Sequence, residues 1–204
     1  MLPIIHLPEL IRYADGLRLQ EQAVEAVLDG TGGELVYLLE HRPVYTIGRL
    51  RDQSSLRDPG ALPHPVVETN RGGQATYHGP GQLVGYPILD LTHRGKDLHE
   101  HLRAIEEALI CACATFGITA TRRDGLTGVW IGHRKLASIG VGVRRWVSMH
   151  GFALNVRNDC LPPFLAITPC GIDGVTMTSL EQETGTAVTI AAAVTAVTRE
   201  LRGL

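Results

Sequence analysis

The segment VWIGHRKLASIGVGVRRWVSMHGFALNV, residues 129–156, indicates a class of fold by its pattern. It contains three runs of strand length with turn residues between them, namely Val129–Ile131, Leu136–Val143 and Val147–Val156. Apolar and polar positions alternate along this part of the chain, which is typical of strands with one buried face. We therefore expect an antiparallel meander. The turn Gly132-His133-Arg134 would place Lys135 at the start of the second strand.

Three further segments have the apolar spacing of helices. Residues 10–29 carry apolar side chains on one face and end before Gly30. Residues 97–116 form one continuous apolar stripe, with Asp97 as the expected N-cap. Residues 189–202 repeat the pattern after a threonine. We expect a helix at the start, the middle and the end of the chain.

The remaining apolar runs have the length of strands. They are Glu34–Glu40, Val44–Ile47 and Leu83–Leu91, and residues 51–65 between them read as an irregular surface loop rich in Pro, Ser, Asp and Arg. Strand runs combined with these three helices predict an α+β fold, with mixed or antiparallel sheets flanked by helices. A length of 204 residues predicts a single domain over residues 1–204.

Composition excludes several classes of function. The net charge of −2 lacks the basic excess with which a nucleic-acid binder neutralises phosphates, so we expect no nucleic-acid partner. No run of 18 apolar residues could span a membrane, and Met1–His6 lacks the basic start and long apolar stretch of a signal peptide. We therefore expect a soluble, cytoplasmic protein with no membrane association.

The four cysteines differ in their surroundings. They are too few for a disulfide scaffold and lack the paired spacing of zinc ligands, so we expect free thiols and no metal. Cys113 belongs to the apolar stripe of residues 97–116, and Cys111 lies two positions away, so both read as structural. Cys160 gives no signal. Cys170, between a proline and a glycine, lies in a rigid turn where a reactive thiol would be exposed.

Lysine usage points to one candidate partner for that thiol. Of 19 basic residues, 17 are arginine, and only Lys96 and Lys135 are lysine. Lysine can accept and release a proton, whereas arginine in practice cannot. A nearby ammonium would lower the pKa of a thiol from about 8.5. Lys135 is one candidate for this role, and His78 or His150 in a Cys–His pair is the alternative.

A glycine-rich stretch, Arg71–Gln82, is a candidate ligand loop. It has four glycines in twelve residues, which is poor for a strand or a helix. Such a loop suits a ligand that lies against main-chain N–H groups, although a plain surface turn would have the same composition. No phosphate-binding or dinucleotide-binding glycine motif occurs in the chain.

Five motifs together carry a family resemblance. In order along the chain they are His41–Arg49 (HRPVYTIGR), Arg71–Gln82 (RGGQATYHGPGQ), Lys135–Gly140 (KLASIG), Met149–Asn155 (MHGFALN) and Pro169–Gly171 (PCG). In this order they resemble the octanoyltransferases of lipoate biosynthesis, from about residue 5 to residue 200. The resemblance implies the fold of the biotin and lipoate protein ligase catalytic domain.

The resemblance also implies a reaction and its residues. It implies transfer of octanoyl from acyl carrier protein to one lysine of a lipoyl domain, as in 2-oxoacid dehydrogenases and the glycine cleavage H protein. It makes Cys170 the carrier of the acyl thioester and Lys135 the residue that tunes it, with no cofactor. It implies substrate contacts from Arg71, Gly72, Gly73, Gln74, Ala75, Thr76, Tyr77, His78, Ser138, Ile139, Gly140, His150, Gly151, Phe152 and Ala153.

Other readings of the same chain stay open. An ATP-dependent lipoate or biotin ligase on this fold would need no cysteine, a binding module for lipoyl domains or acyl carriers would need no chemistry, and a cysteine hydrolase would release free octanoate. The arginines Arg49, Arg122-Arg123 and Arg144-Arg145 are candidates to meet an acidic acyl carrier protein. From the family we expect a monomer.

Overall fold

A mixed sheet forms the centre of the computed structural model, which describes residues 1–49, 53–172 and 174–204. Within those residues the strand order is β1-β2-β6-β10-β9-β8-β7, and β11 pairs with β9. The strands are β1 (Ile4–Ile11), β2 (Leu35–His41), β6 (Gln82–Ile88), β7 (Thr121–Arg123), β8 (Leu126–Ile131), β9 (Arg134–Arg144), β10 (Val147–Asn155) and β11 (Thr176–Met177). Among the described residues of this sheet, the parallel pairs are β1–β2 and β9–β11, and the other pairs are antiparallel.

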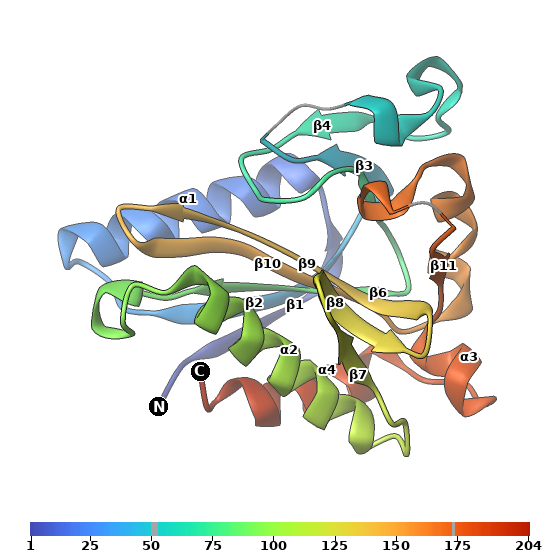
Figure 1. Cartoon of the computed structure of the whole chain (residues 1–204). Coiled ribbons are helices and arrows are strands. Elements are labelled where there is room, and N and C mark those ends of the chain that lie inside the picture. The colour runs from blue at the N-terminus through green and yellow to red at the C-terminus, as the bar shows by residue number, and fades with distance from the viewer. Residues whose placement is uncertain (50–52, 173) are drawn as a thin grey trace.

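Helices cover both faces of this sheet (Figure 1). Helix α1 (Tyr13–Asp29) lies along one face, and α2 (Leu98–Ala114) and α4 (Ile190–Leu201) pack together on the other. A short helix, α3 (Leu180–Thr184), precedes α4. This arrangement confirms the predicted α+β class, because helices and a largely antiparallel sheet occupy separate layers.

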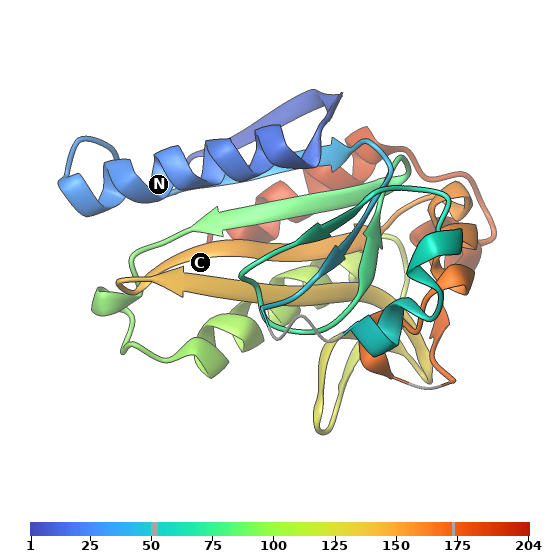
Figure 2. The same cartoon turned by 90° about the horizontal axis from the view of Figure 1, so that it is seen from above.

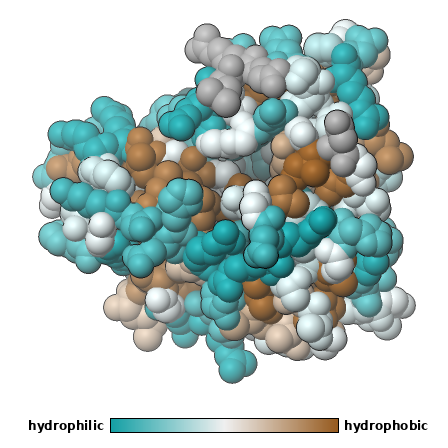
Figure 3. Space-filling view, viewed as in Figure 1, coloured by the Kyte–Doolittle hydropathy of each residue, from teal (hydrophilic) through white to brown (hydrophobic). Residues whose placement is uncertain are grey.

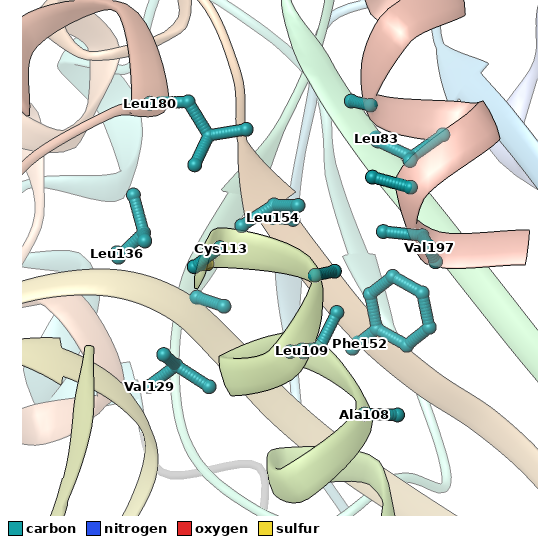
Figure 4. Close-up of a cluster of buried hydrophobic side chains, with 14 of the residues drawn as sticks. Leu83, Ala108, Leu109, Cys113, Val129, Leu136, Phe152, Leu154, Leu180 and Val197 are labelled. Carbon is teal, nitrogen blue, oxygen red and sulfur yellow. The ribbon is translucent and has the colours of Figure 1, made fainter. Parts of the chain in front are cut away.

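Two apolar cores hold these layers together. The larger one joins α2 and α4 to the sheet, and Leu109, Cys113, Phe152 and Val197 meet in it (Figure 4). The second lies under α1 and includes Val24 from the helix. Both cores are built from side chains that alternate along the strands, so the sheet is buried on both faces.

A small second sheet stands on the same side as α1 (Figures 1 and 2). Its order is β4-β3-β5, from β3 (Val44–Ile47), β4 (Val66–Glu68) and β5 (Thr76–His78). Its apolar face packs on the 3₁₀ turns that follow β10 and makes a third core. These turns are η4 (Asn158–Cys160), η5 (Pro162–Ala166) and η6 (Pro169–Gly171). The small sheet therefore holds the glycine-rich stretch, Arg71–Gln82, against the main sheet.

The meander and the later helices follow the sequence prediction closely. Strands β8, β9 and β10 are antiparallel neighbours in the predicted order, and Lys135 is the second residue of β9. Helices α2 and α4 begin after their predicted caps, since Asp97 accepts hydrogen bonds from the N–H groups of His99 and Glu100, and Thr189 from that of Ala192.

Other boundaries were wrong. Leu10 lies in β1 and the helix begins only at Tyr13, because residues 4–11 pair with β2 in parallel, a long-range contact that a local pattern does not reveal. The strand predicted over Leu83–Leu91 ends at Ile88, and η3 (Leu91–His93) follows.

The loop predicted over residues 51–65 is irregular where it is described, with short 3₁₀ turns η1 (Gln53–Leu56) and η2 (Pro59–Ala61). Residues 51 and 52 lie outside the described residues. No helix in the described parts of the chain is long and apolar enough to cross a bilayer.

Candidate active site

A cavity of about 610 Å³ lies where the glycine-rich stretch passes over the main sheet. Its volume falls in the usual range of about 300–1,000 Å³ for small-molecule sites. Cys170 and Lys135 both line it, together with residues of β6, β9 and β10. On the face shown in Figure 1, several separate hydrophobic patches lie between hydrophilic residues (Figure 3).

Lys135 is buried at the start of β9, with 2% of its surface exposed. Its Nζ donates a hydrogen bond to Sγ of Cys170 at 3.3 Å. The same nitrogen lies 5.0 Å from the ring centroid of Trp130, its cross-strand neighbour on β8. The amine of Lys135 therefore contacts the ring of Trp130 on one side and the sulfur of Cys170 on another, and the sulfur is its hydrogen-bond acceptor.

Cys170 occupies a strained turn. Its φ of 56° and ψ of 17° are left-handed, a conformation uncommon for residues other than glycine and often found at functional sites. Its backbone N–H donates to the carbonyl of Ala75 at 2.8 Å, which ties the turn to the glycine-rich stretch. The Oγ of Ser138, on β9, lies 3.7 Å from Sγ. The hydrogen bond to Ala75 and the contact with Ser138 therefore both fix the position of the Cys170 thiol.

The electrostatics of the site favour a thiolate. Burial by itself would raise the pKa of the Cys170 thiol, but the charge of Lys135, hydrogen bonds from Ser138 and Lys135, and the charge of Arg71 outweigh it and lower the pKa. Burial instead raises the pKa of Cys113 to about 12 and raises that of Cys160. Cys170 is thus the cysteine that its surroundings activate.

Glycines let the glycine-rich stretch lie directly on β9. The N–H of Gly72 donates to the carbonyl of Val141 at 2.9 Å. A Cβ placed on Gly140 would lie 2.8 Å from the carbonyl oxygen of Gly72, and one on Gly142 would lie 3.2 Å from that of Asn70. Larger residues at these positions would lift the stretch away from the sheet and open the cavity wall.

Arg71 brings a second buried cation to the cavity. Its guanidinium donates to the carbonyl and hydroxyl of Thr46, at 2.8 and 2.7 Å, and to the carbonyl of Gly72 at 2.9 Å. All of these acceptors are neutral. Among the described residues that line the cavity there is no aspartate or glutamate, so Arg71 and Lys135 make the site electropositive.

Three buried polar atoms of the cavity wall have no hydrogen-bond partner within the described chain. They are Nε of Arg71, Oγ1 of Thr76 and Nδ1 of His150. Buried polar groups are nearly always paired, so unpaired ones along a cavity are the mark of a site that receives a ligand with polar groups or ordered water.

The histidines form a separate neutral cluster. His150 contacts Oδ1 of Asn70 at 2.5 Å, and Nδ1 of His78 contacts Gln82 at 2.8 Å. Burial lowers the pKa of His150 to about 4 and holds that of His78 well below its usual value. The polar side chains that contact Sγ of Cys170 in the described structure are Lys135 and Ser138, so the geometry favours the lysine over a Cys–His pair.

The structure brings nearly all of the predicted site residues to this one cavity. Those that line it are Arg71, Gly72, Gly73, Gln74, Thr76, His78, Lys135, Ser138, Ile139, Gly140, His150, Gly151, Phe152, Ala153 and Cys170. Ala75, directly before β5, and Tyr77, within β5, do not, because the side chains of both enter the third core. His150 lies inside β10.

Several residues of the site were missed from the sequence. Tyr13 and Asn70 line the cavity, and Trp130 lies beside Lys135. Asn70 directly precedes the glycine-rich stretch, which is a weak signal, while Tyr13 was read only as part of an apolar helix face. No group of three or more potential metal ligands occurs among the residues that the structure describes.

The arginines proposed to meet an acidic partner have different surroundings. Arg122 is paired with Glu106 and Glu107, and Arg144 with Glu25. Arg49 is exposed and lines the cavity. Of these arginines, Arg49 is the one among the cavity's lining residues.

Comparison with known proteins gives a consistent result. Residues 12–202 match the model of the lipoyl protein ligase A/B catalytic domain. An octanoyltransferase of Geobacter sulfurreducens is 55% identical over 95% of this chain and 81% of its own length.

Solved structures share the fold at low sequence identity. A lipoate-protein ligase A bound with ATP matches with a TM-score of 0.70 at 17% identity, over 99% of this chain and 84% of its own. A biotin protein ligase from Aquifex aeolicus matches with a TM-score of 0.57 at 14% identity, over 99% and 71%.

Proposed function

Because the chain belongs to the family of lipoyl protein ligase A/B catalytic domains, and its relatives are octanoyltransferases, we propose that it transfers octanoyl through a thioester on Cys170. The chain is an acyltransferase of protein lipoylation. The observation that carries the covalent mechanism is the 3.3 Å contact between Nζ of Lys135 and Sγ of Cys170, both of which line the cavity. The donor we propose is octanoyl-acyl carrier protein, and the acceptors are lipoyl domains of 2-oxoacid dehydrogenases and the glycine cleavage H protein.

The first half-reaction loads the enzyme. The thiolate of Cys170 attacks the carbonyl carbon of the donor thioester, and the tetrahedral intermediate expels the donor thiolate. Lys135, as an ammonium 3.3 Å from Sγ, gives its proton to that leaving thiol. The products are octanoyl-Cys170, a free donor thiol and a neutral Lys135.

Side chains, more than the nearby main chain, stabilise the oxyanion in this proposal. The N–H groups of Cys170 and Gly171 donate to the carbonyls of Ala75 and Thr168, and that of Gly72 to Val141. These three N–H groups already donate to main-chain carbonyls and are not free to bind an oxyanion. The Lys135 ammonium and the Ser138 hydroxyl remain as donors beside the sulfur.

The second half-reaction unloads it. The neutral amine of the acceptor lysine attacks the thioester carbonyl, the thiolate of Cys170 leaves, and neutral Lys135 takes the proton that the new amide nitrogen loses. The ammonium is thereby restored beside a thiolate. One octanoyl group has moved from sulfur to nitrogen, and no external energy source is needed because a thioester is converted to an amide.

The cavity also supports the proposed cargo. Val84, Ile139 and Ala153 line it with apolar surface, which suits an eight-carbon chain. Its cationic lining, which includes the exposed Arg49, suits the acidic carrier protein.

Intact-protein mass spectrometry tests this function. The enzyme is incubated briefly with octanoyl-acyl carrier protein, without ATP or acceptor, and then mapped by peptide digestion. We expect one octanoyl adduct, on Cys170, which disappears when a lipoyl domain is added and reappears on the lysine of that domain.

Other outcomes separate the alternatives. Transfer without any adduct would replace the covalent mechanism by direct transfer within a ternary complex. Transfer only from free octanoate with ATP would make the chain a ligase. Release of octanoate in the absence of acceptor, as the main product, would make it a hydrolase.

A further inference from the structure

Space for the Lys135 side chain depends on a single glycine of the neighbouring strand. Gly128, in β8, has a φ of +129°, which side-chain-bearing residues rarely adopt. A Cβ built there would lie 2.6 Å from the carbonyl oxygen of Ala137, 2.8 Å from Cε of Lys135 and 3.4 Å from its Nζ. The strand register between β8 and β9 also shifts just beyond this residue, between Val129 and Trp130.

The backbone of Gly128 is held from the other side by a buried carboxylate. Its N–H donates to Oε1 of Glu106, on α2, at 2.9 Å. Glu106 is fully buried, and its Oε2 accepts from Arg103 at 2.5 Å and from Arg122 at 3.1 Å. Each carboxylate oxygen therefore has a donor, and α2 is tied to β8 at the residue that borders the Lys135 amine.

We propose that Glu106 and Gly128 are positioning residues for Lys135: the carboxylate fixes the Gly128 backbone, and the missing side chain leaves the space in which the ammonium reaches Cys170. This inference deepens the proposed function and rests on it. It assigns no chemical step to either residue. Two substitutions on different elements should therefore shift the reactivity of the same thiol in the same direction.

The pH dependence of Cys170 alkylation by iodoacetamide tests the proposal, because it follows the thiolate and requires no octanoyl substrate. Lys135→Met supplies the reference shift. Gly128→Ala pushes against Cε of Lys135, so we expect its alkylation midpoint to move to higher pH by about one unit, a roughly tenfold lower rate at pH 7.

Glu106→Gln should move the midpoint in the same direction by a smaller amount. An amide has one oxygen and one NH₂, so in either orientation a donor faces a donor, either Gly128 N–H or an arginine. Circular dichroism and thermal melting identify variants that do not fold. If Gly128→Ala does not fold, Glu106→Gln carries the test.

Each variant has a matched control. Gly132→Ala changes another glycine with positive φ, at the turn between β8 and β9, where an added Cβ meets nothing within 4 Å. Glu107→Gln removes the neighbouring carboxylate, which pairs with Arg122 and is more than half exposed. Both controls should keep the wild-type alkylation profile.

The outcomes separate this inference from the proposed function. Wild-type profiles in folded Gly128→Ala and Glu106→Gln, alongside a shifted Lys135→Met, would overturn the positioning role alone. An unshifted Lys135→Met would overturn the Cys–Lys pair and this inference with it. Equal shifts in the controls would also overturn it, since they would show a general effect of altering the hairpin or the α2 charges.

Discussion

Lys135 can return the proton that it releases only because it is an amine and not a guanidinium. Lys135→Arg would keep a positive charge beside Cys170, but arginine does not deprotonate under these conditions, so it could not receive a proton from the acceptor amine. The buried space is also shaped for a lysine, which is among the largest fully buried side chains. We expect octanoyl transfer to fall by about 10²-fold or more in a steady-state assay.

The chain contains its own control for that substitution. Lys96 is the only other lysine, and it lies exposed before α2. Lys96→Arg should keep full activity. Turnover close to that of wild type in Lys135→Arg would remove proton transfer by Lys135 from the mechanism.

Thiol chemistry should distinguish Cys170 from the other cysteines by pKa and not by exposure. Cys111 and Cys170 are both partly exposed, yet burial and the Glu107 carboxylate raise the pKa of Cys111, while Lys135 helps to lower that of Cys170. We expect limiting iodoacetamide at pH 7 to modify Cys170 first, as read by peptide mapping. Labelling of Cys111 ahead of Cys170 would contradict this electrostatic account.

Among the elements, α2 carries two cysteines that we expect to affect stability and not catalysis. Cys113 faces the larger core and is fully buried, whereas Cys111, half a turn away, is partly exposed. Cys113→Ala should lower the free energy of unfolding by about 1–2 kcal/mol, because it removes a buried sulfur and leaves a small void. Cys111→Ala should leave it nearly unchanged, as urea denaturation would show.

Both α2 variants should transfer octanoyl at the wild-type rate once folded, because neither sulfur reaches the cavity. Loss of activity in a folded Cys111→Ala or Cys113→Ala protein would mean that α2 has a chemical role that its packing does not reveal.

The elements predicted well were those that a local pattern specifies. The 97–116 stripe with its Asp97 cap gave α2, and alternation gave β9 and β10. Strand β1 was missed because its partner, β2, lies about 30 residues away, and the apolar spacing from Leu10 onward continues smoothly into α1. Strand β5 was missed because the surrounding glycines argue against any strand.

The sequence could predict those site residues whose side-chain type itself indicates a chemical role. Cys170, between a proline and a glycine, and Lys135, in a chain of arginines, could be named as candidates from the residues, and the family resemblance, not the residue types, chose Lys135 over His78 and His150 as the partner. Gly128 and Glu106 could not, although each left a trace: a glycine inside a strand pattern and a carboxylate beside an apolar helix stripe. Their importance arises only when α2, β8 and β9 meet.

For the whole molecule, four buried histidines make the folded state sensitive to acid. His41, His78, His101 and His150 lie in the interior, and burial lowers the pKa of each, to about 4 for His41, His101 and His150. Between that value and about 6.5, the unfolded chain binds protons that the folded chain does not. Stability is therefore fully present above about pH 6.5 and declines as the pH falls, by on the order of 3 kcal/mol for His41 alone at pH 4.

Because a domain of this size has only about 5–15 kcal/mol of stability, we expect cooperative unfolding before pH 4 is reached. The measurement is urea denaturation at steps from pH 7 to pH 4. His101→Leu, whose ring lies outside the cavity, should reduce the slope by about one proton, or ~1.4 kcal/mol per pH unit. A protein that keeps its full stability down to pH 4 would show that these imidazoles are protonated inside the fold. His78 and His150, beside Arg71, would then be charged at that pH and not neutral.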